Sequence, residues 1–293
     1  MRARLVHSFT TVVLTILLGG LIGATLVRNA PGFGVDEREF DARFNAETVR
    51  RIRHESDGGR NSVVSYYLRY LWGALHGDLG ISATFHRPVS ALIAERFPET
   101  ARSVGAGLAC GWMLGMLSAL IAAAIARPAF DMLTGSIAAF FLCLPSSVLA
   151  LTMVLAGRLE ERAAVAGVIA LVIFPRVFRY ARAILGRVAC APHVLMARAK
   201  GVRPLRLVWA HVLRPATPAV MALLGVSVSV AFGAAIPIEV LCDSPGLGQL
   251  AWEAALKRDL PLLVDITLLV ALLAGVSGLA AEIARSSPAV DRS

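Results

Sequence analysis

Charged residues are scarce in this chain of 293 residues, and together with its high hydrophobic content this excludes a soluble domain. Only 17% of the residues are Asp, Glu, Lys or Arg, whereas 57% are hydrophobic, and the mean hydropathy is +0.68. This composition is typical of an all-α membrane protein that crosses the bilayer several times. The net charge of +9 comes from basic residues that collect between apolar runs, without interleaved aromatics. Membrane topology therefore explains the charge better than nucleic-acid binding does.

Motifs for metal binding and catalysis are also missing. The chain has four cysteines and six histidines but neither a CxxC nor an HxxxH pair, so we expect no zinc site and no disulfide framework. The only lysines, Lys200 and Lys257, lie outside any GxxxxGK[ST] motif, and GxSxG and HExxH are absent. The sequence thus predicts no catalytic residue, no metal site and no cofactor. Cys110 and Cys143 lie in apolar runs, where we expect small buried side chains.

Six apolar segments are present, and crossing ~30 Å of hydrocarbon takes ~20 helical residues. They cover residues 10–27, 101–126, 132–156, 163–180, 219–241 and 261–283. Arg2 and Arg4 precede the first segment without an acid, which places the N-terminus in the cytoplasm. A cleaved signal peptide is the alternative, but further spans follow and residues 28–31 form a poor cleavage site. Six spans return the C-terminal tail, residues 286–293, to the cytoplasm.

One long polar region, residues 28–100, separates the first two spans. Its ten arginines balance ten acids, so we place it outside the membrane as an extracytoplasmic insertion. Near its end Pro88 can start a helix over residues 89–97 that leads into the second span.

Small residues and prolines mark special positions within the spans. Two faces repeat a small residue every four positions, which favours close helix contact, although chance clustering in a glycine-rich chain is the alternative. They are Gly107, Gly111 and Gly115 in the second span, and Gly225, Ser229 and Gly233 in the fifth. The fifth-span face could instead form the wall of a pathway. Pro145 predicts a break near the middle of the third span.

The longest strongly basic stretch covers residues 192–218 and contains no acid. Pro192 can open one short helix, and Gly201 can end it in the left-handed conformation. Pro204 can then open a second helix with an apolar stripe, formed by Leu205, Val208, Trp209 and Val212. We predict an elbow of two amphipathic pieces on the cytoplasmic surface that docks a partner protein. A basic loop that only sets topology is the alternative.

Three stretches together resemble a known family. They are YLRYLWGALHGDLGISATFHRPVSALIAERFPET at 67–100, ARAKG…H.LRP at 197–214, and PGLG at 245–248 preceded by Glu239. In order and spacing they are similar to the B-type permease subunits of the dipeptide/oligopeptide/nickel family of ABC importers, over about residues 1–285. The chain departs from the family at Pro31-Gly32-Phe33, where Pro-Gly-Asp is usual.

The resemblance implies a type I ABC importer permease fold, with a five-span core at 101–285 and a coupling loop at 192–218. In that family the coupling helix docks on the ATPase. Here it would comprise Leu195, Met196, Ala197, Arg198, Ala199, Lys200 and Gly201. Leu195-Met196-Ala197 replace the Glu-Ala-Ala of the general motif, so its Glu is missing. Candidates to line the pathway are Ser227, Ser229 and Pro237.

The implied partners are a second, C-type permease, ATP-binding subunits, an extracytoplasmic substrate-binding protein and the lipid of a bacterial inner membrane. Peptides are the default substrate, while nickel, glutathione-like thiols and sugars are handled by relatives. A self-sufficient secondary transporter is a second class, and it requires intramembrane ionisable residues and inverted repeats. Asp265, Glu239 and Glu282 near span ends are candidates for a proton relay, but an interfacial or cavity-facing position is the favoured alternative. An integral membrane enzyme lacks a clustered nucleophile or metal ligands.

Overall fold

The computed structural model describes residues 77–286 except 126–127, 158–159 and 204–205, together with Trp72, Gly73 and scattered residues between Thr10 and Thr25. Most of the predicted first span, of the predicted extracytoplasmic insertion and of the tail lies outside the described residues. The count of six spans therefore stays a prediction.

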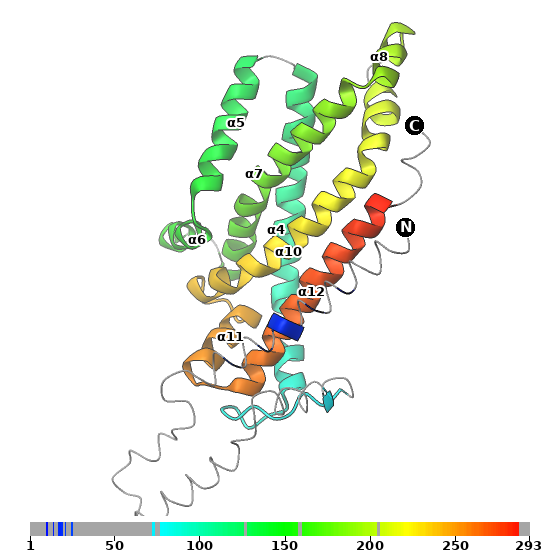
Figure 1. Ribbon diagram of the computed structural model, residues 1–293. Helices are drawn as coiled ribbons and strands as arrows, with labels where there is room; N and C mark the ends of the chain where they lie inside the picture. The colour runs from blue at the N-terminus through cyan, green and yellow to red at the C-terminus, as the bar shows by residue number, and fades with distance from the viewer. Residues whose placement is uncertain are drawn as a thin grey trace, which may run out of the picture. The chain divides into compact units, whose positions relative to one another are not determined.

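The described residues form helices joined by short turns (Figure 1). In chain order these are α4 (Val89–Ile125), α5 (Pro128–Cys143), α6 (Ser146–Leu155), α7 (Glu161–Ala189), α8 (Pro192–Ala199), the π-helix η2 (Leu207–Leu213), α10 (Arg214–Leu241), α11 (Leu247–Leu256) and α12 (Leu260–Ser286). Four are long and apolar enough to cross a bilayer, namely Val89–Ala123, Glu161–Ala189, Leu207–Leu241 and Pro261–Ile283. The pair α5 and α6 makes a fifth if it counts as one span.

The third predicted span is broken, as Pro145 predicts. Pro145 has no N–H to bond the carbonyl of Phe141, so α5 ends at Cys143 and α6 begins at Ser146. The two helices meet at an angle of 92°. The predicted break within residues 132–156 is therefore confirmed, and it divides the segment into two helices at nearly a right angle.

The chain forms two compact units, and the first contains residues 96–250 and 272–286. Its centre is α7, which contacts α5, α6 and α10 and buries Ile169 and Ile173 completely. The predicted glycine face of the second span packs against α7. A Cβ at Gly107 would lie 2.7 Å from the Cβ of Ile169, and one at Gly111 would lie 2.9 Å from the Cβ of Ile173. Such distances leave room only for glycine, so the prediction of close helix approach is confirmed.

The second unit contains the described part of 14–95 and residues 251–271. Its loop carries the GDLG…S…RPV residues. Gly77 and Gly80 have φ values of 80° and 76°, which favour glycine, and Val89 N–H donates to the Gly80 carbonyl at 3.1 Å. Asp259 accepts hydrogen bonds from the Ser82 hydroxyl and from Thr84 N–H. The motif therefore specifies a tight loop that is held by one buried carboxylate.

Two expectations about helix ends and burial are wrong. Residues 89–97 are not a separate helix, because α4 continues through Pro98 to Ile125. Cys110 and Cys143, which were expected to be buried, are both exposed.

Candidate functional site

The short helix α8 begins and ends as the sequence predicts. Pro192 occupies its first turn, where a missing N–H costs nothing. Gly201 follows its last residues with φ of 73°. Val202 N–H donates to the Ala197 carbonyl at 3.3 Å, and Gly201 N–H donates to the Arg198 carbonyl at 3.0 Å. This pair of bonds is a Schellman motif, which requires the left-handed conformation at Gly201.

One side of α8 is buried in the chain and the other is open. Val194 and Ala197 are buried in the hydrophobic core together with Leu185 of α7 and Leu207 and Val212 of η2. The exposed residues of the predicted docking set are Leu195 (52%), Met196 (60%), Arg198, Ala199, Lys200 and Gly201. The helix is thus anchored along one edge and presents an apolar and basic surface on the other. Leu195 and Met196 thus expose two large apolar side chains on a helix of only eight residues, and exposed apolar surface of this kind is typical of a protein-binding site.

The second part of the predicted elbow differs from the expectation. It is not a separate amphipathic helix, because the π-helix η2 continues directly into α10. Leu207 and Val212 are buried, whereas Val208 and Trp209 are exposed at 38% and 75%. Leu205 lies outside the described residues. Residues five apart share a face in a π-helix, so the stripe expected from α-helical spacing is wrong except at Val212.

Proline explains the contact between the two arms of the elbow. Pro215 has no N–H to donate to the carbonyl of His211, four residues earlier. That carbonyl lies 3.2 Å from Nε2 of His193 on α8. The His193 side chain of one arm therefore contacts the backbone of the other arm.

The elbow is strongly basic. Its cationic residues are Arg198, Lys200, Arg203, Arg206 and Arg214, and all five are exposed. No described carboxylate forms an ion pair with any of them. The charge is therefore available to a partner, and it also agrees with a cytoplasmic position.

At the other end of α10, Glu239 and the PGLG sequence form one buried structure. The Glu239 side chain is fully buried, and its Oε2 accepts a hydrogen bond from Gly248 N–H at 2.7 Å. A Cβ at Gly246 would overlap the Glu239 carboxylate, and a Cβ at Gly248 would lie 2.6 Å from the Cα of Ile236. Both glycines are needed because the carboxylate packs directly against their backbone. The sequence indicated Glu239 and PGLG separately but gave no sign of this contact.

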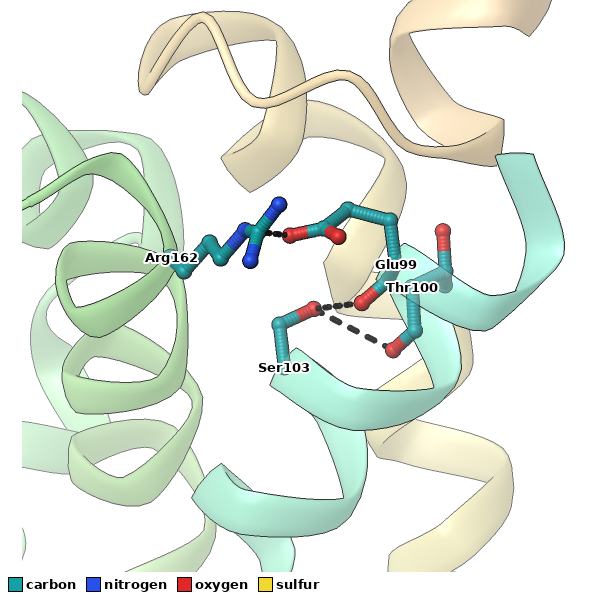
Figure 2. A network of polar contacts seen from close by, with 4 residues as sticks. All are labelled: Glu99, Thr100, Ser103 and Arg162. Carbon is teal, nitrogen blue, oxygen red and sulfur yellow. Dashed lines mark hydrogen bonds and ion pairs between the residues drawn. The ribbon is translucent and has the colours of Figure 1, made fainter. Parts of the chain in front are cut away.

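A second carboxylate, Glu99, lies in the polar network of Figure 2. Arg162, in the first turn of α7, points toward Glu99 of α4, and Nε lies 2.5 Å from Oε1. Ser103 donates to the carbonyls of Glu99 and Thr100 at 3.1 Å each. The Thr100 hydroxyl accepts Leu247 N–H at 2.8 Å, which ties α4 to the PGLG turn. Sequence reasoning missed this network because its members come from segments far apart in the chain.

The residues proposed to line a pathway lie in three different environments. Ser227 is buried and donates to the Leu223 carbonyl. The Ser229 hydroxyl lies 2.8 Å from that of Ser277 on α12, and a Cβ at Gly225 would lie 2.6 Å from the Cβ of Ala281. Pro237 is exposed. At Gly225 and Ser229 the small face therefore makes helix contact, whereas at Gly233 nothing lies within 4 Å.

Long apolar helices, a pair of helices that meet at a sharp bend and an anchored basic elbow are typical of a multi-pass membrane subunit. The chain belongs to the family described as binding-protein-dependent transport system inner membrane component, which it matches over residues 111–286. The resemblance to ABC importer permeases is thereby confirmed. A putative peptide transport system permease protein of Brucella suis biovar 1 (strain 1330) is 30% identical over 236 residues, covering 73% of this chain and 75% of the relative. The oligopeptide transport system permease protein OppB of Escherichia coli (strain K12) is 28% identical over 224 residues, covering 71% and 73%.

Proposed function

We propose that the chain is a transmembrane subunit of an ATP-driven, binding-protein-dependent peptide importer in a bacterial inner membrane. The family supports a multi-pass membrane subunit. The names of the relatives, which specify peptide and oligopeptide transport, support peptides as the substrate. Nickel or another small solute is the second candidate, because the resemblance extends to nickel importers.

The proposal rests above all on the geometry of α8. Its buried side chains, Val194 and Ala197, fix it to α7 and η2, and its exposed residues 195, 196 and 198–201 face away from the chain. A partner that pushes on this surface moves α7 and α10 with it, since those helices share one core. Such rigid-body motion of packed helices is how alternating access is driven from one side of a membrane.

The partners follow from what the chain contains. Because neither lysine lies in a P-loop, ATP-binding subunits supply the hydrolysis. A C-type permease completes the pathway, and an extracytoplasmic binding protein delivers the substrate. Both termini and α8 face the cytoplasm, while α11 and the loop at 77–88 face outward. Pro237, which is exposed, lines the route between the two permeases more directly than Ser227 or Ser229.

A charge reversal on α8 tests the proposal. Replacing exposed Met196 by Glu puts an acid in the apolar part of the docking surface. We expect the variant to lose co-purification with the ATP-binding subunits and to lose ATP-dependent peptide uptake in proteoliposomes. The matched control is Leu256→Glu, since Leu256 is 65% exposed at the end of α11 and on the predicted outer side.

The outcomes separate the alternatives. Undiminished ATPase binding by Met196→Glu would reject α8 as the docking element. Uptake by the purified chain alone under an ion gradient would instead support a secondary transporter. Nickel uptake without peptide uptake by the complete complex would select the second candidate.

A further inference from the structure

A cavity of about 270 Å³ lies where the broken helix bends. It is lined by the residues around Pro145, by Val172 and Arg176 of α7, and by Val230 and Ala234 of α10, all within the first compact unit. Figure 1 shows the junction of α5 and α6 beside α7. Pockets for drug-sized ligands usually have 300–1,000 Å³, so this cavity is suited to one end of a larger molecule.

Arg176 brings a positive charge to this cavity. It lies near the middle of α7, ~22 Å along the axis from Glu161 at 1.5 Å per residue. Its neighbours Ile173, Pro175 and Val177 are buried and apolar. Within the predicted span at 163–180, Arg176 lies four residues from the predicted cytoplasmic end. An ionisable side chain inside a membrane span is costly even there, and it usually faces a cavity with a functional role.

The guanidinium has capacity left for a ligand. Nη1 donates to the Val172 carbonyl at 2.6 Å, which orients the side chain along its own helix. An arginine carries five N–H donors in a planar fork that suits a carboxylate. No carboxylate among the described residues forms an ion pair with Arg176, and none lines the cavity.

The broken helix adds to the positive field. Ser146, at the start of α6, lines the cavity. The N–H groups of Val148 and Leu149 donate to the Pro145 carbonyl. Those of Ser146 and Ser147, the first two residues of α6, have no acceptor inside the helix, and no side chain caps them. A helix N-terminus therefore supplies partial positive charge on the same side as Arg176. In other transporters, interrupted membrane helices direct such ends at anionic groups of the substrate.

We propose that this cavity binds the C-terminal carboxylate of a peptide during its passage, with Arg176 as the residue that recognises it. The inference rests on the proposed function, since it takes the cargo to be a peptide. The cavity holds the terminal carboxylate and the residue that bears it, while the rest of the peptide stays in the pathway. Its positive lining disfavours a free metal cation at this point.

The exposed thiol of Cys143 lines the same cavity and reports on its occupancy. The experiment uses the complete transporter in proteoliposomes, with Cys143 as the sole cysteine of this chain. The labelling rate by a maleimide is measured with trialanine and with trialanine amide, which differ in the terminal charge. We expect trialanine to slow labelling about tenfold, as the loss of one charged hydrogen-bonded contact implies, and the amide to have little effect.

Two further variants make the test specific. Arg176→Gln removes the protection by trialanine, whereas Arg176→Lys keeps part of it because the charge remains. A variant with Cys110 as the sole cysteine is the matched control, since Cys110 is exposed on α4 and does not line the cavity. Its labelling is expected to be the same with either peptide.

Several results would overturn the proposal. Equal protection by the amide, or protection that persists in Arg176→Gln, would show that the carboxylate is not recognised there. Protection by inorganic phosphate as strong as by trialanine would assign the site to a phosphate group. If the cysteine variants do not assemble, the KM for trialanine uptake in Arg176→Gln with its native cysteines gives the answer. We expect it to rise about tenfold, and an unchanged KM would reject the site.

The proposed function has a separate readout. Absence of uptake of any peptide by the wild-type complex would reject peptide import itself. Normal uptake without dependence on Arg176 would reject only the carboxylate site.

Discussion

The basic elbow and the Glu239 turn both depend on glycine, but for opposite reasons. Gly201 at the elbow has φ of 73° and open space around it, because a Cβ there would meet nothing within 4 Å. Gly246 in the turn has no positive φ, but a Cβ there would overlap the buried Glu239 carboxylate. Backbone conformation selects glycine at the exposed end, and lack of space selects it at the buried end. The two ends should therefore respond differently to the same small substitution.

The largest effect is expected at the buried end. Gly246→Ala forces either the Glu239 carboxylate or the turn to move, which costs about 3 kcal/mol in the free energy of unfolding. Thermal unfolding in detergent measures the change. Gly233→Ala is the control, since Gly233 lies on α10, the helix that carries Glu239, and a Cβ there would meet nothing within 4 Å. Equal stability of both variants would mean that space does not select glycine at Gly246.

A double substitution sharpens this point. If the clash with the Glu239 carboxylate destabilises Gly246→Ala, then Gly246→Ala should be less destabilising in a chain that already carries Glu239→Ala. We expect the effects of Gly246→Ala and Glu239→Ala to be strongly non-additive, by about 1 kcal/mol or more. The unfolding free energies of the two single variants and the double variant measure this coupling. Additive effects would show that the two groups act independently.

At the elbow, Gly201→Ala is expected to cost about 1 kcal/mol, because a residue with a Cβ is strained in the left-handed region. The strain affects the end of α8, so affinity for the ATP-binding subunits falls more than global stability does. Gly201→Asn should be milder, since Asn tolerates this conformation. A titration with the ATP-binding subunits compares the variants. Identical affinities for Ala and Asn would contradict a conformational role.

The smallest effect is expected for the ion pair of Figure 2. The Arg162 side chain is 64% exposed, so water screens much of its attraction to Glu99. Arg162→Ala should lower the free energy of unfolding by about 1 kcal/mol or less. The difference from wild type should shrink at high salt, and Arg162→Lys should be intermediate. A salt-independent loss would point to packing by the arginine instead.

Local chemistry allowed several features to be predicted from the sequence. Pro192 and Gly201 predict the ends of α8, Pro145 predicts the break, and the repeat at Gly107 predicts close helix contact; the structure confirms each. These features depend on residues within a few positions of one another. The resemblance to importer permeases is confirmed by the family match.

Features that depend on distant or unusual contacts could not be predicted. The π-helix changes which residues face the core, because Leu207 is buried together with Val212 while Val208 and Trp209 are exposed. The pairing of Glu99 with Arg162 joins residues from different helices. Which helix a glycine face packs against is likewise set by tertiary structure. For the candidate site, the sequence predicted the position of α8. It did not predict which side chains of η2 pack against α8.

The unbroken helix from Leu207 to Leu241 has a mechanical consequence. At 1.5 Å per residue its 35 residues extend ~52 Å, well beyond the ~30 Å of hydrocarbon. A tilt of ~10° about its midpoint would displace each tip by ~4.5 Å, in opposite directions. A helix that tilts in this way carries a small displacement at the elbow to Glu239 and the PGLG turn without bending or local unfolding.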